Sequence, residues 1–588
     1  MGNEKRLILA VVLMLGVVAL VNVLFPPQRP PPQDQQPDSV EVTPADLTSP
    51  AAGQEEALQG QPPIVDDTQA VPDIVPPAAI TAAEQPQAED TVWVSSPIYR
   101  FGFASRGGRL VSAEMLEFES LAEETKGQPV ELVPPGTEDF FTHQWLIGDD
   151  TLDLRRAQFD IQPRTGISLA SGGQPQSLTL TYTYPGTEFR VELSYTFTPD
   201  NYVVDLQGRL IGGPARGWWL LGLGPGLLSN EWDPASDYRT NLAYSAMGLE
   251  GVVSEKVEAL EPGERVTLDG PFDWVAVRTK YFLTAVVLPV DADEEGRFGG
   301  LMIRSLPESF RAQAAASFPV SREGDFQRTV YMGPQDYGRL KAVGRELDKV
   351  LPFGYKWLEP VLRPLAGAIT TLLTWMHSFF GLGYGWILII FGIGIRVVLF
   401  PLYQKSMRSQ MATMRVQPLM KEIQEKYKNE PQKLQQEMMK LYREHKVNPL
   451  GGCLPMLLPF PILIALFFVF RDTIEFRGVQ FLWLPDLSQP DPLFIIPVLM
   501  GASIFLLQWI TMKSSPPNPQ MKMMMYVMPV MMVVLFFRFA SGLNLYYATM
   551  NLASLPQQLY VAKERKAAQA QGPPGKKPEE KPRKKSKT

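Results

Sequence analysis

The hydrophobic positions of the chain fall into a few long runs that are separated by polar stretches of different character. The run from Leu7 to Phe25 is apolar except for Asn22 and follows two basic residues. A second run, GWILIIFGIGIRVVLFP at 385–401, contains a single charge, Arg396. With its aromatic flanks this run is about twenty residues long, enough at 1.5 Å per residue to cross a hydrocarbon core of roughly 30 Å. We therefore predict a membrane span at each run.

The arginine inside the second run has two interpretations. An arginine at the centre of a spanning helix costs roughly 2.5 to 3.5 kcal/mol on insertion scales, so it is expected to face water, an anion or a protein interior. Arg396 is then a functional site. The alternative is snorkelling, because the basic end at Lys405 lies close by in the sequence and a long side chain can lift its guanidinium toward the headgroups.

Three further apolar blocks follow at 454–470, 493–510 and 521–560, and the last divides at 538–542 into two short spans. The prediction is therefore six spans, five of them after the middle of the chain. Polar groups within hydrocarbon must find partners or water. Together with Arg396 they line a hydrated concavity, or they form ordinary interhelical hydrogen bonds. The polar residues in these blocks are Gln508, Asn544, Tyr546, Tyr547, Thr549 and Asn551.

Between residues 90 and 338 the pattern alternates with a period of two, as in SLTLTYTY, FRVELSYTF and YVVDL. Alternation with β-branched and aromatic residues favours antiparallel strands, and a region of this length favours a large sandwich. We predict one all-β domain outside the membrane. His143 in this region and His377 later have no Cys, Asp or Glu set at ligand spacing, so lone surface or core histidines are predicted in place of a metal site.

Helical periodicity returns after the β region. The segment 339–383 carries tryptophans beside charged residues and suits an amphipathic helix in the outer membrane interface. A second span is the alternative, which Pro360 and Pro364 disfavour. The polar segment 404–450 splits at 429–431, a helix-start signature with proline in the first turn, into two amphipathic arms. This hairpin is either a rigid clip closed by its apolar stripe or a methionine-rich surface that receives a partner.

Charge and composition fix the expected topology. The net charge of −7 hides an asymmetry: residues 404–450 hold ten Lys and Arg against five Asp and Glu, and residues 563–588 hold ten against three. The positive-inside rule places both stretches, and both termini, in the cytoplasm. Residues 1–25 are then an uncleaved anchor, with a cleaved signal peptide as the alternative. The stretch 26–89, rich in Pro, Gln, Ala and acidic residues, is predicted to be a flexible tether. Cys453 is the only cysteine, so no internal disulfide can form.

Several strings occur in a recognisable order after the arginine-bearing span and the charged hairpin: KVNPLGGCLPMLLPFPILIALFF, DPLFIIPVLMGASIFLLQ, MYVMPV and SGLNLYY. In this arrangement the chain resembles the YidC family of membrane protein insertases, strongly from about Trp357 to Tyr560. The resemblance is weaker over the β region, where WVAVRTKYFLTAVVLP is the most suggestive string. It implies the Gram-negative form, whose large periplasmic domain is a β-supersandwich similar to sugar mutarotases.

The resemblance also implies a function. The family inserts inner-membrane proteins, and helps them fold, through a hydrophilic groove that is open to the cytoplasm and to lipid. Arg396 matches the groove arginine, Gln508 a polar groove position, and Tyr546 with Tyr547 the tyrosine pair of the last span. The implied partners are nascent membrane proteins, the Sec translocon, the lipid bilayer, and the ribosome through the basic tail and the hairpin. The tail has an alternative reading as a topology signal only.

The sequence argues for transport of polypeptides without catalysis. No Walker-type glycine loop, catalytic residue, metal site, cofactor or small-molecule substrate is expected. An ion-coupled transporter is one rival, but no second copy of the charged span is found. A tethered periplasmic sugar-binding protein is the other, although the β region has no convincing set of carboxylates with a histidine.

The predicted fold is a polytopic α-helical membrane protein, multi-pass in the bacterial inner membrane, with an all-β sandwich domain in the periplasm. Its predicted segments are the anchor 1–25, the linker 26–89, the β-sandwich domain 90–338, the interfacial helices 339–383, the arginine-bearing span 384–403, the cytoplasmic hairpin 404–450, spans three to six in 451–562 and the basic tail 563–588.

Overall fold

The computed structural model describes the β region and most of the predicted helical region. Every described residue belongs to one compact unit within 86–588. The predicted anchor 1–25 and nearly all of the linker 26–89 lie outside the described residues, as do residues 571–588 of the predicted tail. The described residues are 89–147, 150–213, 217–307, 309–351, 359–402, 404, 416, 419–420, 422–428, 430–445, 460–513 and 519–570.

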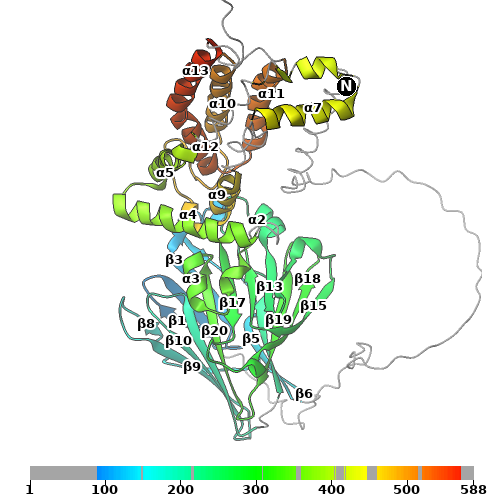
Figure 1. The fold of residues 1–588 in the computed structure, drawn as a ribbon. Helices are drawn as coiled ribbons and strands as arrows, with labels where there is room; N and C mark the ends of the chain where they lie inside the picture. The colour runs from blue at the N-terminus through cyan, green and yellow to red at the C-terminus, as the bar shows by residue number, and fades with distance from the viewer. Residues whose placement is uncertain are drawn as a thin grey trace, which may run out of the picture. The chain divides into compact units, whose positions relative to one another are not determined.

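In the part of the chain that the structure describes, twenty strands fold into three sheets of five, nine and six strands, and Figure 1 shows the arrangement of these strands. The predicted alternation is confirmed, since β10 (Arg190–Phe197) alternates between buried and outward-facing side chains along its whole length. The strand order of the nine-stranded sheet is β14-β13-β16-β17-β20-β11-β10-β9-β7. The other strands are β1 (Thr91–Ser95), β2 (Tyr99–Ala104), β3 (Leu110–Glu119), β4 (Pro129–Glu131), β5 (Phe140–Ile147), β6 (Asp150–Asp153), β7 (Asp160–Gln162), β8 (Ile167–Ser168), β9 (Gln176–Thr183), β11 (Val203–Ile211), β12 (Gly217–Gly224), β13 (Ala243–Gly248), β14 (Gly251–Lys256), β15 (Arg265–Phe272), β16 (Trp274–Arg278), β17 (Phe282–Val287), β18 (Phe298–Ser305), β19 (Ala312–Val320) and β20 (Asp325–Pro334).

The inward faces of these sheets form one hydrophobic core. Trp145, Trp219 and Trp274 are fully buried in it. Burying about 200 Å² of aromatic side chain contributes roughly 5 kcal/mol before the entropy cost of ordering, so a few such residues hold a domain without a disulfide. His143 is also fully buried in this domain: the Trp219 indole donates to its Nδ1 at 3.2 Å, and its Nε2 lies 3.1 Å from the hydroxyl of Tyr195. It is a core histidine, and burial lowers its pKa to about 3.

The rest of the described chain is helical and follows the β region (Figure 1). Two short helices, α2 and α3, belong to the β region itself. α11 and α12 are separated within the predicted break at 538–542, as expected, whereas the break at Ser554 between α12 and α13 was not predicted. The helices are α2 (Pro234–Asn241), α3 (Tyr337–Val343), α4 (Glu359–Phe380), α5 (Tyr384–Val398), α7 (Pro431–Glu444), α9 (Phe460–Asp472), α10 (Ile495–Lys513), α11 (Pro519–Phe536), α12 (Ser541–Ala553) and α13 (Leu555–Ala570).

Length and hydropathy identify fewer membrane crossings than the six predicted. Among the described helices, α10 meets the requirement by itself, and α4 with α5 meets it only as a pair bent by 116°. The reason lies in helix length: the fifteen residues of α5 extend about 22 Å, which is shorter than the hydrocarbon core. The six spans stay a prediction, and the first of them lies outside the described residues.

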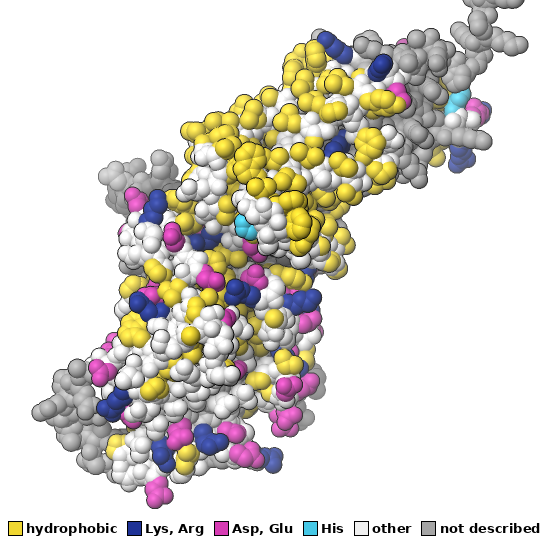
Figure 2. Space-filling view, turned by 90° about the vertical axis from the view of Figure 1, so that its left-hand side faces the viewer, with side chains coloured by type: hydrophobic (Ala, Val, Ile, Leu, Met, Phe, Trp, Pro, Cys, Tyr) yellow, Lys and Arg dark blue, Asp and Glu magenta, His cyan; other side chains and the backbone are white. Residues whose placement is uncertain are grey.

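The bend between α4 and α5 separates an amphipathic helix from the arginine-bearing one. α4 buries one stripe against the helical core, while Trp375 and Phe379 on another stripe are 55% and 68% exposed. An exposed aromatic stripe is typical of a helix that lies in a membrane interface. Figure 2 shows hydrophobic side chains gathered over the helical region, whereas charged side chains are spread over the β domain.

The hairpin predicted at 404–450 is described in part. α7 begins where the helix-start signature predicts, with Pro431 in its first turn. The hydroxyl of Tyr442 on α7 lies 3.8 Å from the sulfur of Met420 on the first arm. The two arms therefore contact each other at Met420, a residue of the apolar stripe predicted for the first arm, while Met407, Met411 and Met414 of that stripe lie outside the described residues.

Candidate functional site

The candidate site is built on the contact between α5 and α12. Ile387, Leu388 and Phe391 anchor α5 in the helical core. One turn before the arginine, Gly392 lies against α12, where an added Cβ would make an ordinary contact of 3.4 Å with the side chain of Thr549. This packing fixes the face of α5 on which the next turn, and hence the arginine, is presented.

Arg396 is partly buried and has a defined polar partner. Its Nη2 donates a hydrogen bond of 2.6 Å to Oε1 of Gln557, a buried residue near the start of α13. Because Gln557 is uncharged, this bond orients the guanidinium without neutralising it. The sequence reasoning missed Gln557, although a glutamine within an apolar block is the same kind of signal that singled out Arg396.

Gln508 and the tyrosine pair occupy neighbouring helix contacts. Nε2 of Gln508 on α10 lies 3.2 Å from the sulfur of Met528 on α11. The Tyr546 ring is buried and its centroid lies 5.7 Å from that of Phe391 on α5. Tyr547 is partly buried and stacks on Phe536 of α11 at 5.8 Å. The structure thus places Tyr546 against the helix that carries Arg396, and Gln508 and Tyr547 against α11.

The buried asparagines of α12 hold helices together. Nδ2 of Asn544 donates to the carbonyl oxygens of Phe536 and Phe539 at 3.0 and 3.4 Å, which fastens the turn between α11 and α12. Nδ2 of Asn551 donates to Oγ of Ser503 on α10 at 3.1 Å. These are interhelical hydrogen bonds of the kind that polar groups in a membrane must form.

A second polar cluster joins the β domain to the segment between α9 and α10. Arg477 and Glu231 form an ion pair at 2.9 Å with side chains only 3% and 7% exposed. The same guanidinium donates to the carbonyl oxygens of Glu119 and Asn230 at 2.8 and 2.9 Å, and the indole of Trp232 donates to Asp486 at 3.1 Å. Burial raises the pKa of Glu231, and the charge of Arg477 opposes that rise. None of these contacts was predicted.

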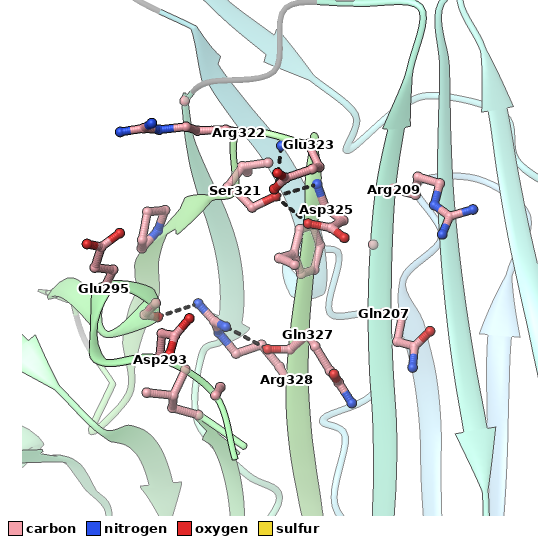
Figure 3. A pocket seen from close by; sticks show the side chains of 18 of the residues that line it. Gln207, Arg209, Asp293, Glu295, Ser321, Arg322, Glu323, Asp325, Gln327 and Arg328 are labelled. Carbon is pink, nitrogen blue, oxygen red and sulfur yellow. Dashed lines mark hydrogen bonds between the residues drawn. The ribbon is translucent and has the colours of Figure 1, made fainter. Parts of the chain in front are cut away.

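A pocket of about 1050 Å³ lies on the surface of the β domain, lined by polar and charged side chains from β10, β11, β20 and the turn at Glu294–Gly296 (Figure 3). Its most buried charged group is Arg328, whose Nη1 and Nη2 donate to the carbonyl oxygens of Gln327 and Gly296 at 2.6 and 2.8 Å. The guanidinium also lies 4.0 Å from the Phe318 ring, and burial lowers its pKa to about 9. Arg328 therefore connects β20 to the turn at Glu294–Gly296 through its hydrogen bond to Gly296.

Two family models match the chain in succession. A model described as the YidC periplasmic domain matches residues 91–368, and one described as the 60Kd inner membrane protein matches residues 375–569. The fold and these matches define an inner-membrane protein whose helical region follows a periplasmic β-sandwich domain. A membrane protein insertase YidC from Chlorobaculum tepidum is 32% identical over 88% of this chain and 91% of its own length, and one from Syntrophus aciditrophicus is 30% identical over 95% and 100%. The chain belongs to the YidC family of membrane protein insertases, and the predicted family is thus confirmed.

Solved structures of the family are also found. A crystal structure of an active YidC insertase with its first transmembrane domain resolved is 20% identical, covers 81% of this chain and 93% of its own, and gives a TM-score of 0.32. The sequence relatives establish the family. They do not favour the transporter or the sugar-binding protein that the sequence left as alternatives.

Proposed function

We propose that this chain inserts inner-membrane proteins through a hydrophilic groove formed by Arg396, Gln508, Asn544, Tyr546 and Tyr547. The observation that carries the proposal is a cationic side chain inside an apolar helical region, held at 2.6 Å by an uncharged amide. A partly buried cation that donates to an uncharged amide is able to exchange this hydrogen bond for one to an anion. Asn544 supports the groove by fixing the α11–α12 turn, and Gln508 and the tyrosines form its walls.

The mechanism uses binding free energy and requires no covalent step. A polar segment that must cross the membrane faces the cost of leaving water, and a hydrated groove partway through shortens the path without water. Arg396 pairs transiently with carboxylates of that segment. The apolar segment that follows moves into lipid and supplies about 25 cal/mol for each Å² of apolar surface removed from water.

The proposal includes a topology with six spans and both termini in the cytoplasm. The first span is residues 1–25 and the hairpin 404–450 is cytoplasmic. Support comes from charge, because the segment 471–491 has four acidic and two basic residues, whereas the hairpin and the tail are basic. The short α5 reaches across the bilayer where the groove locally reduces the apolar thickness.

The proposed partners are nascent membrane proteins, the Sec translocon and the ribosome. The chain acts alone or together with the Sec translocon. The hairpin and the tail 563–588 face the ribosome, because their excess of Lys and Arg suits the phosphate backbone of ribosomal RNA.

The test uses one short single-span substrate in two versions, with an acidic or a neutralised translocated tail. Arg396→Lys keeps the cation but loses the bidentate fork, so partial insertion of the acidic version is expected, and Arg396→Ala should lose more. A charge-assisted contact in a partly dehydrated site is worth about 1.5 to 3 kcal/mol, which is roughly a tenfold effect or more on insertion. The measurement is the insertion rate of each version at matched protein levels.

A different result is expected if Arg396 instead extends its guanidinium to the lipid headgroups. A snorkelling arginine affects stability or topology, and therefore affects all substrates alike. Equal slowing of the acidic and neutral versions by Arg396→Ala would contradict the proposal.

A further inference from the structure

The bond between Arg396 and Gln557 joins two helices that lie far apart in the sequence. Gln557 is 8% exposed and stands in the first turn of α13. Its position is set by the α12–α13 junction, where Oγ of Ser554 donates to the carbonyl of Asn551 at 2.6 Å and the backbone N–H of Gln558 donates to the carbonyl of Ser554 at 3.0 Å. The amide oxygen is therefore held against the guanidinium by the fold of the helical region.

The chemistry of this amide resembles that of the proposed ligand. A glutamine side chain has the shape of a carboxylate but no charge, and its oxygen accepts the same guanidinium N–H that a carboxylate would accept. Hydrogen bonds between two charged groups are stronger than those with one neutral partner, so an arriving carboxylate competes favourably for the arginine. Among the described residues Nε2 of Gln557 has no hydrogen-bond partner, which leaves this buried N–H available to donate to a second acceptor.

We propose that Gln557 is a neutral placeholder on Arg396. Its amide oxygen occupies the position of a substrate carboxylate oxygen, gives way when an acidic segment arrives, and its Nε2 then donates to that carboxylate. Gln557 is thus a specificity-determining residue for substrates with acidic translocated tails. The inference rests on the proposed function of Arg396.

The test replaces the placeholder by a permanent anion. Gln557→Glu gives Arg396 a carboxylate that an incoming tail must displace, so the ratio of insertion rates for acidic over neutral tails should fall about tenfold. The matched control is Gln558→Glu, which makes the same charge change one residue along α13 and should leave the ratio unchanged. Insertion of the neutral tail at the rate of the unmodified protein shows that the Gln557→Glu variant folds.

Two further variants separate the possible outcomes. Gln557→Leu removes the amide oxygen and the Nε2 donor without adding charge, so the acidic-to-neutral ratio should fall, but by less than in Arg396→Ala. An unchanged or raised ratio would refute the donor role of Nε2, and a ratio lowered as far as by Arg396→Ala would mean that Gln557 only positions the arginine. In an Arg396→Ala background, Gln557→Leu should cause a much smaller selective loss than it causes in the unmodified protein, because the acidic tail is then no longer held beside residue 557. The proposal is refuted if Gln557→Glu slows insertion of both tails by the same factor, or if its acidic-to-neutral ratio equals that of Gln558→Glu. If Arg396→Ala slows the acidic and the neutral tail by the same factor, the proposed role of Arg396 is refuted, independently of the result for Gln557.

Discussion

The ion pair between Arg477 and Glu231 predicts how firmly the β domain is held to the helical region. Replacing Arg477 by alanine removes the 2.9 Å ion pair and two hydrogen bonds to backbone carbonyls, and it leaves Glu231, which is 7% exposed, with the weaker attraction of Lys280. Breaking a buried pair in this way typically costs about 3 to 5 kcal/mol. Arg477→Ala should therefore loosen the junction by at least about 3 kcal/mol, which is roughly a hundredfold in the opening equilibrium.

Hydrogen–deuterium exchange of the whole protein in detergent or nanodiscs measures this opening. Peptides that contain Asn230 and Asp486 should exchange much faster in Arg477→Ala, while the core strand β10 should be unaffected because it lies in the nine-stranded sheet, which contains none of the residues that hydrogen-bond to Arg477. Glu231→Gln, which keeps the shape but removes the anion, should have a smaller effect. An exposed pair provides the control: Arg164 and Asp160 are 78% and 49% exposed, and Arg164→Ala should change nothing measurable.

The reasoning would be refuted by an Arg477→Ala variant whose junction peptides exchange as slowly as those of the unmodified protein. It would also fail if β10 exchanged faster to the same extent, because the ion pair would then stabilise the whole domain and not the junction.

Two further predictions concern the segments that flank the proposed groove. Removing residues 91–334 while keeping the helical region should leave insertion of small substrates largely intact, because the groove residues lie outside the β domain and Arg477 then becomes solvated. A truncated protein that is stable and correctly oriented but inactive would show that the β domain is required for insertion. Removing 563–588 should weaken ribosome co-sedimentation and reduce its salt dependence, since Lys and Arg release counterions on binding to phosphate. Equal sedimentation and equal salt slopes for both proteins would exclude a role for the tail.

The β strands could be predicted from the sequence because period-two alternation is a local signal. FRVELSYTF predicted β10, and the neighbouring runs predicted β9 and β11. The order of strands in the three sheets could not be predicted, since β11 pairs with β20 across more than a hundred residues and local pattern does not encode such pairing. The break between α4 and α5 lies at the predicted boundary between segments 339–383 and 384–403, but its angle of 116° could not be predicted, because prolines and glycines mark breaks without giving their angle.

The sequence identified the unusual residue of the candidate site, but it did not identify the residues that this side chain contacts. A lone charge in an apolar run identified Arg396, but the face it occupies depends on the packing of Gly392 against α12. Gln557 lies 161 positions away, on α13 beyond the unpredicted break at Ser554. The same limit applies to Arg477 and Glu231, whose separation of 246 positions conceals a buried pair.

The central claim is that Arg396 attracts the charge of the translocated segment, and reversing both charges tests it most directly. The measurement is the ratio of insertion rates for an acidic-tailed over a basic-tailed substrate, with the purified protein in liposomes, for the unmodified chain and for Arg396→Glu. Opposite charges attract in a partly dehydrated site, so the account predicts that Arg396→Glu lowers this ratio about tenfold or more. A ratio that stays the same, with both substrates slowed by one common factor, would contradict it.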